Sequence, residues 1–115
     1  MSLSLKYKPG WNAAQRTAAD TKVGALNDAA GSGGLRVTQV ERSGTSAASR
    51  YSRAGGDIPS GADVDHTIDL QLGGLDAFSN MSPLNFSVNR SLGAQIGWQL
   101  RDVEFGTCVI AVTIC

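Results

Sequence analysis

The chain has 115 residues, a length that fits a single domain with a modest hydrophobic core. It contains no run of the roughly 18 apolar residues that a membrane-spanning helix needs, and its first eleven residues lack the apolar stretch of a signal peptide, so we expect no membrane partner and no leader of its own. Its ten basic and ten acidic residues balance to a net charge of zero, which argues weakly against a nucleic-acid partner.

The first half of the chain is expected to form a long helix, a strand and a short helix. Asn12 can cap an Ala-rich helix, with Gln15 placed to complete a capping box, and the glycine-rich stretch 31–34 ends it. Apolar residues then nearly alternate over residues 35–42, which predicts a strand. A short helix is expected around residues 45–53, before a loop rich in glycine and proline.

A β-hairpin is expected around His66, the only histidine in the chain. Apolar residues alternate imperfectly over residues 63–72, and a Gly-Gly pair closes the segment. The first strand of this hairpin is expected to carry Asp65 and His66, and the second to run from Asp69 to Leu72. A loop over residues 75–80 follows.

A second long helix is expected to begin with Ser82 as its N-cap and Pro83 as its first residue. Apolar residues recur every four positions along it, which predicts one buried stripe: Leu84, Val88, Leu92, Ile96 and Leu100. Residues 106–114 are rich in β-branched side chains and are expected to form a closing strand. These elements predict an α+β fold.

Four polar residues stand at suggestive intervals on these elements. Asp65 and His66 are adjacent, Asn80 follows the histidine by 14 residues, and Asn89 follows it by 23. Two strands, a loop and a helix are the shortest arrangement that would bring these segments together. Each residue also has a structural explanation, since a lone histidine is more often structural and an asparagine is a common turn former.

The stretch "DVDHTIDLQLGG" together with "SNMSPLNFSVNRSLGAQI" resembles the HNH endonuclease superfamily, whose fold is the ββα-metal fold. The resemblance covers residues 63 to about 101, roughly a third of the chain. The resemblance is strongest to members whose motif begins with Asp-His and ends with Asn, such as phage resolvase-type endonucleases and the HNH domain of the CRISPR nuclease. It extends to nuclease domains at the C-terminal ends of bacterial polymorphic toxins.

The resemblance implies a ββα-metal motif over residues 63–101. The sequence patterns add an extension of one helix and one strand over residues 1–62 and the closing strand at 106–114, all within a single domain of residues 1–115. The resemblance also implies a role for each polar residue. Asp65 and Asn89 are the expected ligands of one divalent ion, Mg²⁺ or else Mn²⁺, which both prefer oxygen donors. His66 is the expected general base, because imidazole titrates near neutral pH. Asn80 is expected to hold the loop and the histidine in place.

Basic residues near these positions are candidate contacts to a phosphate backbone. Arg90 adjoins Asn89, and Arg50 and Arg53 precede the motif. A solvated surface explains all three about as well. The halves of the chain differ in charge, since residues 1–53 carry eight basic against three acidic residues and residues 54–115 carry two against seven. Such asymmetry suits a polyanion on one side and a cation on the other.

The sequence therefore predicts a metal-dependent endonuclease that cleaves DNA with little sequence preference, since nothing in it resembles a base-reading helix or a zinc finger. By resemblance it is the effector domain of an interbacterial toxin, delivered into the cytoplasm of a target cell, with an immunity protein as its partner and no small-molecule cofactor. A non-catalytic binding module on the same scaffold and a ribonuclease are the alternatives.

Overall fold

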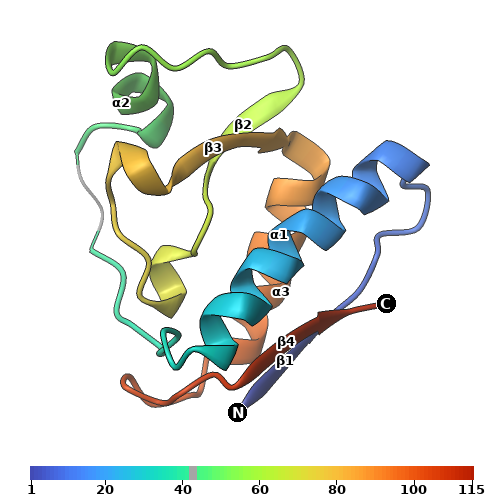
Figure 1. Ribbon diagram of the computed structural model, residues 1–115, viewed down its shortest axis with the longest axis vertical. Helices are drawn as coiled ribbons and strands as arrows, with labels where there is room; N and C mark the ends of the chain where they lie inside the picture. Colours follow the sequence, from blue (N-terminus) through green and yellow to red (C-terminus); the bar gives the residue numbers. More distant parts are fainter. Residues whose placement is uncertain (42–43) are drawn as a thin grey trace.

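The computed structural model describes residues 1–41 and 44–115 and has an α+β fold, as expected. The two long helices, α1 (Ala13–Gly31) and α3 (Phe86–Leu100), lie between two small sheets. One sheet pairs β1 (Ser2–Leu5) with β4 (Ala111–Ile114), and the other pairs β2 (Ala62–His66) with β3 (Met81–Asn85) (Figure 1). No helix in the described ranges is long and apolar enough to cross a bilayer.

Helix α1 begins and ends as its sequence predicts. The side chain of Asn12 accepts a hydrogen bond from the backbone N–H of Gln15, and the side chain of Gln15 accepts one from the backbone of Asn12, which completes the capping box. Residues 32–34 donate their N–H groups back to the last turn, and Gly33 takes a positive φ of 79°. The buried face of the helix is built from small and aliphatic residues: Ala19, Val23, Leu26 and Ala30.

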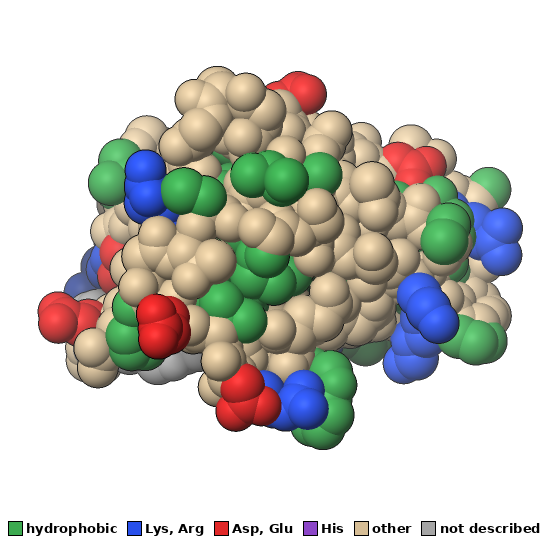
Figure 2. Space-filling view, turned by 90° about the horizontal axis from the view of Figure 1, so that it is seen from below, with side chains coloured by type: hydrophobic (Ala, Val, Ile, Leu, Met, Phe, Trp, Pro, Cys, Tyr) green, Lys and Arg blue, Asp and Glu red, His purple; other side chains and the backbone are tan. Residues whose placement is uncertain are grey.

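The β1–β4 pair is parallel, with Ser2 opposite Ala111 and Leu5 opposite Ile114. Leu3 and Leu5 point inward, as a period of two requires. Strand β1 was not predicted, and β4 occupies only the end of the strand expected at 106–114. Figure 2 shows the face seen from below in Figure 1, whose charged side chains lie mainly around the edge while hydrophobic ones show through its centre.

The strand expected over residues 35–42 was wrong for the described part, residues 35–41. This segment contains one isolated antiparallel bridge, from Arg36 to Cys108. The backbone N–H groups of Arg36 and Thr38 bond to residues 71–72, whereas that of Val37 bonds to Thr107. Because successive residues bond to different segments, no continuous ladder forms. The apolar alternation indicated burial rather than a strand.

The hairpin was predicted with its first strand correct and its second strand wrong. Residues 70–72 form a short 3₁₀ turn, η1 (Leu70–Leu72), and the partner of β2 is β3, with His66 opposite Met81. A second 3₁₀ turn, η2 (Phe78–Asn80), lies in the expected loop.

The start expected for the second long helix, at Ser82 and Pro83, was also wrong. Pro83 lies in β3 opposite Val64, and both strands of a two-stranded sheet are edge strands, where proline is tolerated. The N-cap of α3 is Asn85, whose Oδ1 accepts from the N–H groups of Ser87 and Val88.

Helix α3 buries four of the five residues of its expected stripe: Val88, Leu92, Ile96 and Leu100. The fifth, Leu84, is partly buried on β3. The short helix expected around 45–53 is α2 (Ala47–Arg53), capped by Ser46. The order of elements over residues 62–100 is therefore strand, strand, helix, with two 3₁₀ turns between the strands.

Candidate active site

The imidazole of His66, the last residue of β2, is held by the carboxylate of Asp76. Its Nε2 lies 2.9 Å from Oδ1 of Asp76, and the guanidinium of Arg50 bonds to the same oxygen. These hydrogen bonds, the one from Arg50 foremost, hold the pKa of the Asp76 carboxyl below its ordinary value. An ionised carboxylate only accepts hydrogen bonds, so Nε2 of His66 carries the hydrogen and a neutral ring presents Nδ1 as a base.

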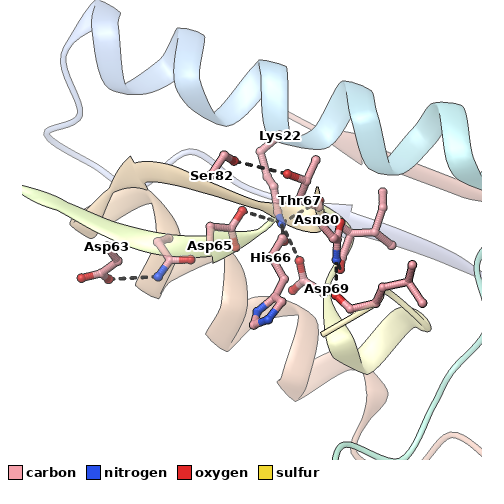
Figure 3. Close-up of polar contacts among 11 residues, drawn as sticks. Lys22, Asp63, Asp65, His66, Thr67, Asp69, Asn80 and Ser82 are labelled. Carbon is pink, nitrogen blue, oxygen red and sulfur yellow. Dashed lines mark hydrogen bonds and ion pairs between the residues drawn. The ribbon is translucent and has the colours of Figure 1, made fainter. Parts of the chain in front are cut away.

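Asp65, the next residue back along β2, is buried against a lysine from α1. The Nζ of Lys22 lies 2.8 Å from Oδ2 of Asp65 and 2.6 Å from Oδ1 of Asp69. It also donates to the carbonyl oxygens of His66, at 2.5 Å, and Thr67, at 2.9 Å. Figure 3 shows Lys22 reaching from α1 to the end of β2, between the two carboxylates. Burial raises the pKa of the Asp65 carboxyl, although Lys22 opposes the shift.

Asn80 fastens the loop that follows β2. Its side-chain oxygen accepts from the N–H of Ile68 at 2.9 Å, and its NH₂ group donates to the carbonyls of Ile68 and Leu75 at 2.9 and 2.8 Å. Its own carbonyl accepts from the N–H of Thr67. The residue thus ties both ends of the segment between His66 and Asp76, which is the arrangement that a loop-holding role requires.

Asn89 and Arg90, in the first turns of α3, both contact Asp63 rather than Asp65. The Nδ2 of Asn89 lies 2.9 Å from Oδ2 of Asp63, and the guanidinium of Arg90 contacts both oxygens at 3.1 Å. Asp63 and Asp65 are two residues apart on β2, so their side chains leave the strand on the same face. The hydrogen bond from Arg90, followed by that from Asn89, lowers the pKa of the Asp63 carboxyl.

We expect the contribution of Asp63 to stability to disappear in acid. Because its folded pKa lies below the ordinary value of 3.8, the contribution is present above that value and is lost as the pH falls through the folded pKa. Asp63→Asn is therefore expected to lower the free energy of unfolding at pH 7 by less than about 1 kcal/mol, since Arg90 is largely exposed and water screens the pair. Urea denaturation at a series of pH values measures this. The difference from the parent should vanish in acid, and Asp57→Asn, at an exposed position, should show none; a difference that persists in acid would contradict the assignment.

Asp65 and His66, the last two residues of β2, both border one hollow. This hollow has a volume of about 130 Å³. It is lined by residues of β2, the following turn and the segment before residue 41: Val40, Asp65, His66, Asp69, Leu70 and Gln71. A second hollow, of about 260 Å³, lies between α1 and the hairpin and is lined by Lys22, Asp65, Thr67 and Ser82 among others.

The structure thus brings the predicted site residues together only in part. Asp65 and His66 share a hollow, Arg50 reaches His66 through Asp76, and Asn89 lies on α3 beside Asp63. Arg53 is exposed at the end of α2. In the described ranges, no three His, Cys, Asp or Glu side chains gather closely enough to hold a metal ion.

Sequence reasoning missed Lys22 and Asp76 as members of the site. Lys22 carried a usable signal, because it lies three residues after Ala19 and four before Leu26, on the buried face of a helix. A charge on that face requires a partner. Asp76 carried no such signal, since it lies in an irregular loop and its contacts depend on tertiary structure. Comparisons of the chain with protein-family models, with curated proteins and with solved structures found no match.

Proposed function

We propose that the protein is a metal-dependent endonuclease of the HNH type, which hydrolyses phosphodiester bonds of DNA with little sequence preference. The observation that carries this proposal is the setting of His66. Its Nε2 is anchored on an ionised carboxylate, and it borders a hollow that is also lined by Asp65. The order of elements around it, strand then strand then helix, agrees with the resemblance of residues 63–101 to that superfamily.

His66 acts as the general base in this proposal. Its Nδ1 takes a proton from water while the oxygen of that water forms a bond to phosphorus. The bond from phosphorus to the leaving sugar oxygen breaks, and that oxygen takes up a proton from solvent. Asp76, held by Arg50, keeps the ring oriented and stabilises the imidazolium that forms.

The side chains present fit a hard divalent ion, Mg²⁺ or Mn²⁺. Asp65 and Asp69 already bind a cation, the ammonium of Lys22, and the buried Oδ1 of Asp69 has this ion pair but accepts no hydrogen bond in the described structure. The NH₂ of Asn89 is taken by Asp63, so its amide oxygen, on the other branch, is directed away from that carboxylate. Asp65 and Asn89 are the proposed ligands. A bound ion would neutralise charge on the phosphate and the leaving oxygen.

Contacts to the nucleic-acid backbone are assigned to an open groove beside Asn89. It has a volume of about 560 Å³ and combines two cations, an exposed aromatic ring and two hydroxyls. Its members are Lys8, Phe86, Ser87, Arg90, Ser91, Ala94 and Gln95. Cations suit phosphates, and aromatic rings suit bases. Arg50 and Arg53 of α2 are proposed to contact phosphates on the side of His66.

The biological setting is also a proposal. By its resemblance to the toxin nucleases, the domain acts in the cytoplasm of a target cell after delivery as part of a larger secreted protein. In the producing cell, an immunity protein binds the domain.

A binding module without catalysis is the second candidate. One observation favours it: Asp65 is bound to Lys22, and Asn89 to Asp63, so both proposed metal ligands already have protein partners. The same residues could also act on RNA, because the hydrolytic step does not use the 2′-hydroxyl.

Incubation of the protein with supercoiled plasmid and Mg²⁺ tests the proposal. We expect nicked and linear products in the presence of Mg²⁺, and none after EDTA removes the metal. Cleavage that continues in EDTA would overturn the metal-dependent mechanism. Tight binding without cleavage would favour the binding module, and faster digestion of total RNA than of plasmid would favour a ribonuclease.

A further inference from the structure

The ammonium of Lys22 lies in a cage of four oxygen atoms. Two of the oxygens belong to the carboxylates of Asp65 and Asp69, and two are the carbonyls of His66 and Thr67, all within 2.9 Å of Nζ. The Lys22 side chain is 5% exposed, and those of Asp65 and Asp69 are 11% and 12% exposed. A solvent-screened surface pair would not be enclosed in this way.

Lysine leaves this cage incompletely satisfied in two respects. An ammonium has three N–H donors and faces four oxygens. Oδ1 of Asp69 is paired with Nζ by charge at 2.6 Å but accepts no hydrogen bond, so its pairing with the ammonium is incomplete. In addition, two carboxylates surround a single positive charge, so the cage retains one negative charge in a place that water hardly reaches.

A divalent ion would remove both deficits. It coordinates six or more oxygens without regard to hydrogen-bond direction, and its two charges balance two carboxylates. Lys22 has room to move away, because it also lines the hollow of about 260 Å³ on the other side, where Thr67 and Ser82 present hydroxyl groups.

We propose that this cage is a divalent-cation site, and that a metal ion enters it by displacing Lys22 into the neighbouring hollow. The inference rests on the proposed function for the role of Asp65, and it adds Asp69 and the carbonyls of His66 and Thr67 to the ligands. Lys22 is then a tethered competitor that keeps the metal-free protein folded and weakens metal binding.

Binding of Mn²⁺, measured by isothermal titration calorimetry, tests the competition. Lys22→Met is expected to bind Mn²⁺ at least about tenfold more tightly than the parent, because the competing charge is gone. Without metal, its melting temperature should fall below that of the parent, since two buried carboxylates lose their partner, and Mn²⁺ should restore it. Lys6→Met, which removes an exposed lysine, is the matched control and should behave as the parent.

A second variant keeps the test decisive if Lys22→Met does not fold. Asp69→Asn leaves Lys22 in place and removes a proposed ligand charge, and we expect it to weaken Mn²⁺ binding at least about tenfold. Unchanged Mn²⁺ binding in Asp69→Asn would overturn the proposal. So would a folded Lys22→Met protein that binds Mn²⁺ no more tightly than the parent.

Failure of the competition proposal and failure of the nuclease proposal give different results. Metal-dependent plasmid cleavage by the parent, with no gain of Mn²⁺ affinity in Lys22→Met, would leave the nuclease intact and overturn the competition. A gain of affinity without cleavage of plasmid or RNA would support the competition and reject the nuclease.

Discussion

Replacing His66 with alanine is expected to reduce the rate of plasmid cleavage by about 10²–10⁴-fold, the usual loss when a general base is removed. The fold should survive, because the imidazole lies at the edge of a hollow and is not among the buried core residues. The measurement is the single-turnover rate of loss of supercoiled plasmid at saturating Mg²⁺. Matching circular dichroism spectra and melting temperatures establish that the loss is chemical.

The companion variant Asp76→Asn separates the base from the residue that positions it. It removes the charge that orients His66 and leaves the imidazole in place, so we expect a smaller loss, of about 10- to 100-fold. The loss should fall on kcat, since Asp76 acts on the reaction through the imidazole of His66. Asp57→Asn, on the exposed loop before β2, is the control. If His66→Ala cleaves as fast as the parent, the proposed chemistry is wrong.

Gly74→Ala is expected to destabilise the domain by about 3 kcal/mol or more. A Cβ at this position would lie 1.7 Å from the carbonyl oxygen of Ile68 and 2.9 Å from Nδ2 of Asn80, distances that real structures do not contain. The backbone must shift to make room, which strains the packing and breaks hydrogen bonds of Asn80, each worth about 1 kcal/mol. Urea denaturation of the parent and the variant measures the difference.

The matched control is Gly93→Ala in the middle of α3. Apart from its chain neighbours and the backbone of its own helix, no described atom lies within 4 Å of a Cβ placed there. Alanine is also the better helix former, so stability should rise by about 0.5–1 kcal/mol. Equal stability of Gly74→Ala and the parent would mean that the loop is not packed against Ile68 as described. The pair of variants therefore distinguishes a close backbone approach from a general effect of losing glycine.

Features that depend on neighbouring residues were predictable from the sequence. The capping box of Asn12 and Gln15 and the four-residue spacing of the α3 stripe are local patterns, and both were confirmed. The position of β3 was not predictable in this way, because 14 residues separate His66 from its partner Met81 and an intervening apolar run, 70–72, imitates a strand. Proline is common at the first position of a helix, so Pro83 predicted a helix start at a place that belongs to β3.

The candidate site divides along the same line. The spacing of His66, Asn80 and Asn89 along the sequence matches a known motif, and this made them candidate site residues. Their catalytic and metal-binding roles stay predictions. The side chains that they contact come from elsewhere in the fold. Lys22 lies more than forty residues before the carbonyls that it contacts. No local pattern predicts which buried charged side chain will pair with which partner. Partner choice of this kind is decided by packing.

The parallel pairing of β1 with β4 has a consequence for the order of folding. Ser2 is opposite Ala111, and Leu5 is opposite Ile114. Leu3 and Leu5 therefore remain without their strand partner until nearly the whole described chain has been synthesised. Contacts of such long sequence separation form slowly, so closure of this sheet should be a late event, and a protease that removes residues 111–115 would leave β1 without its strand partner.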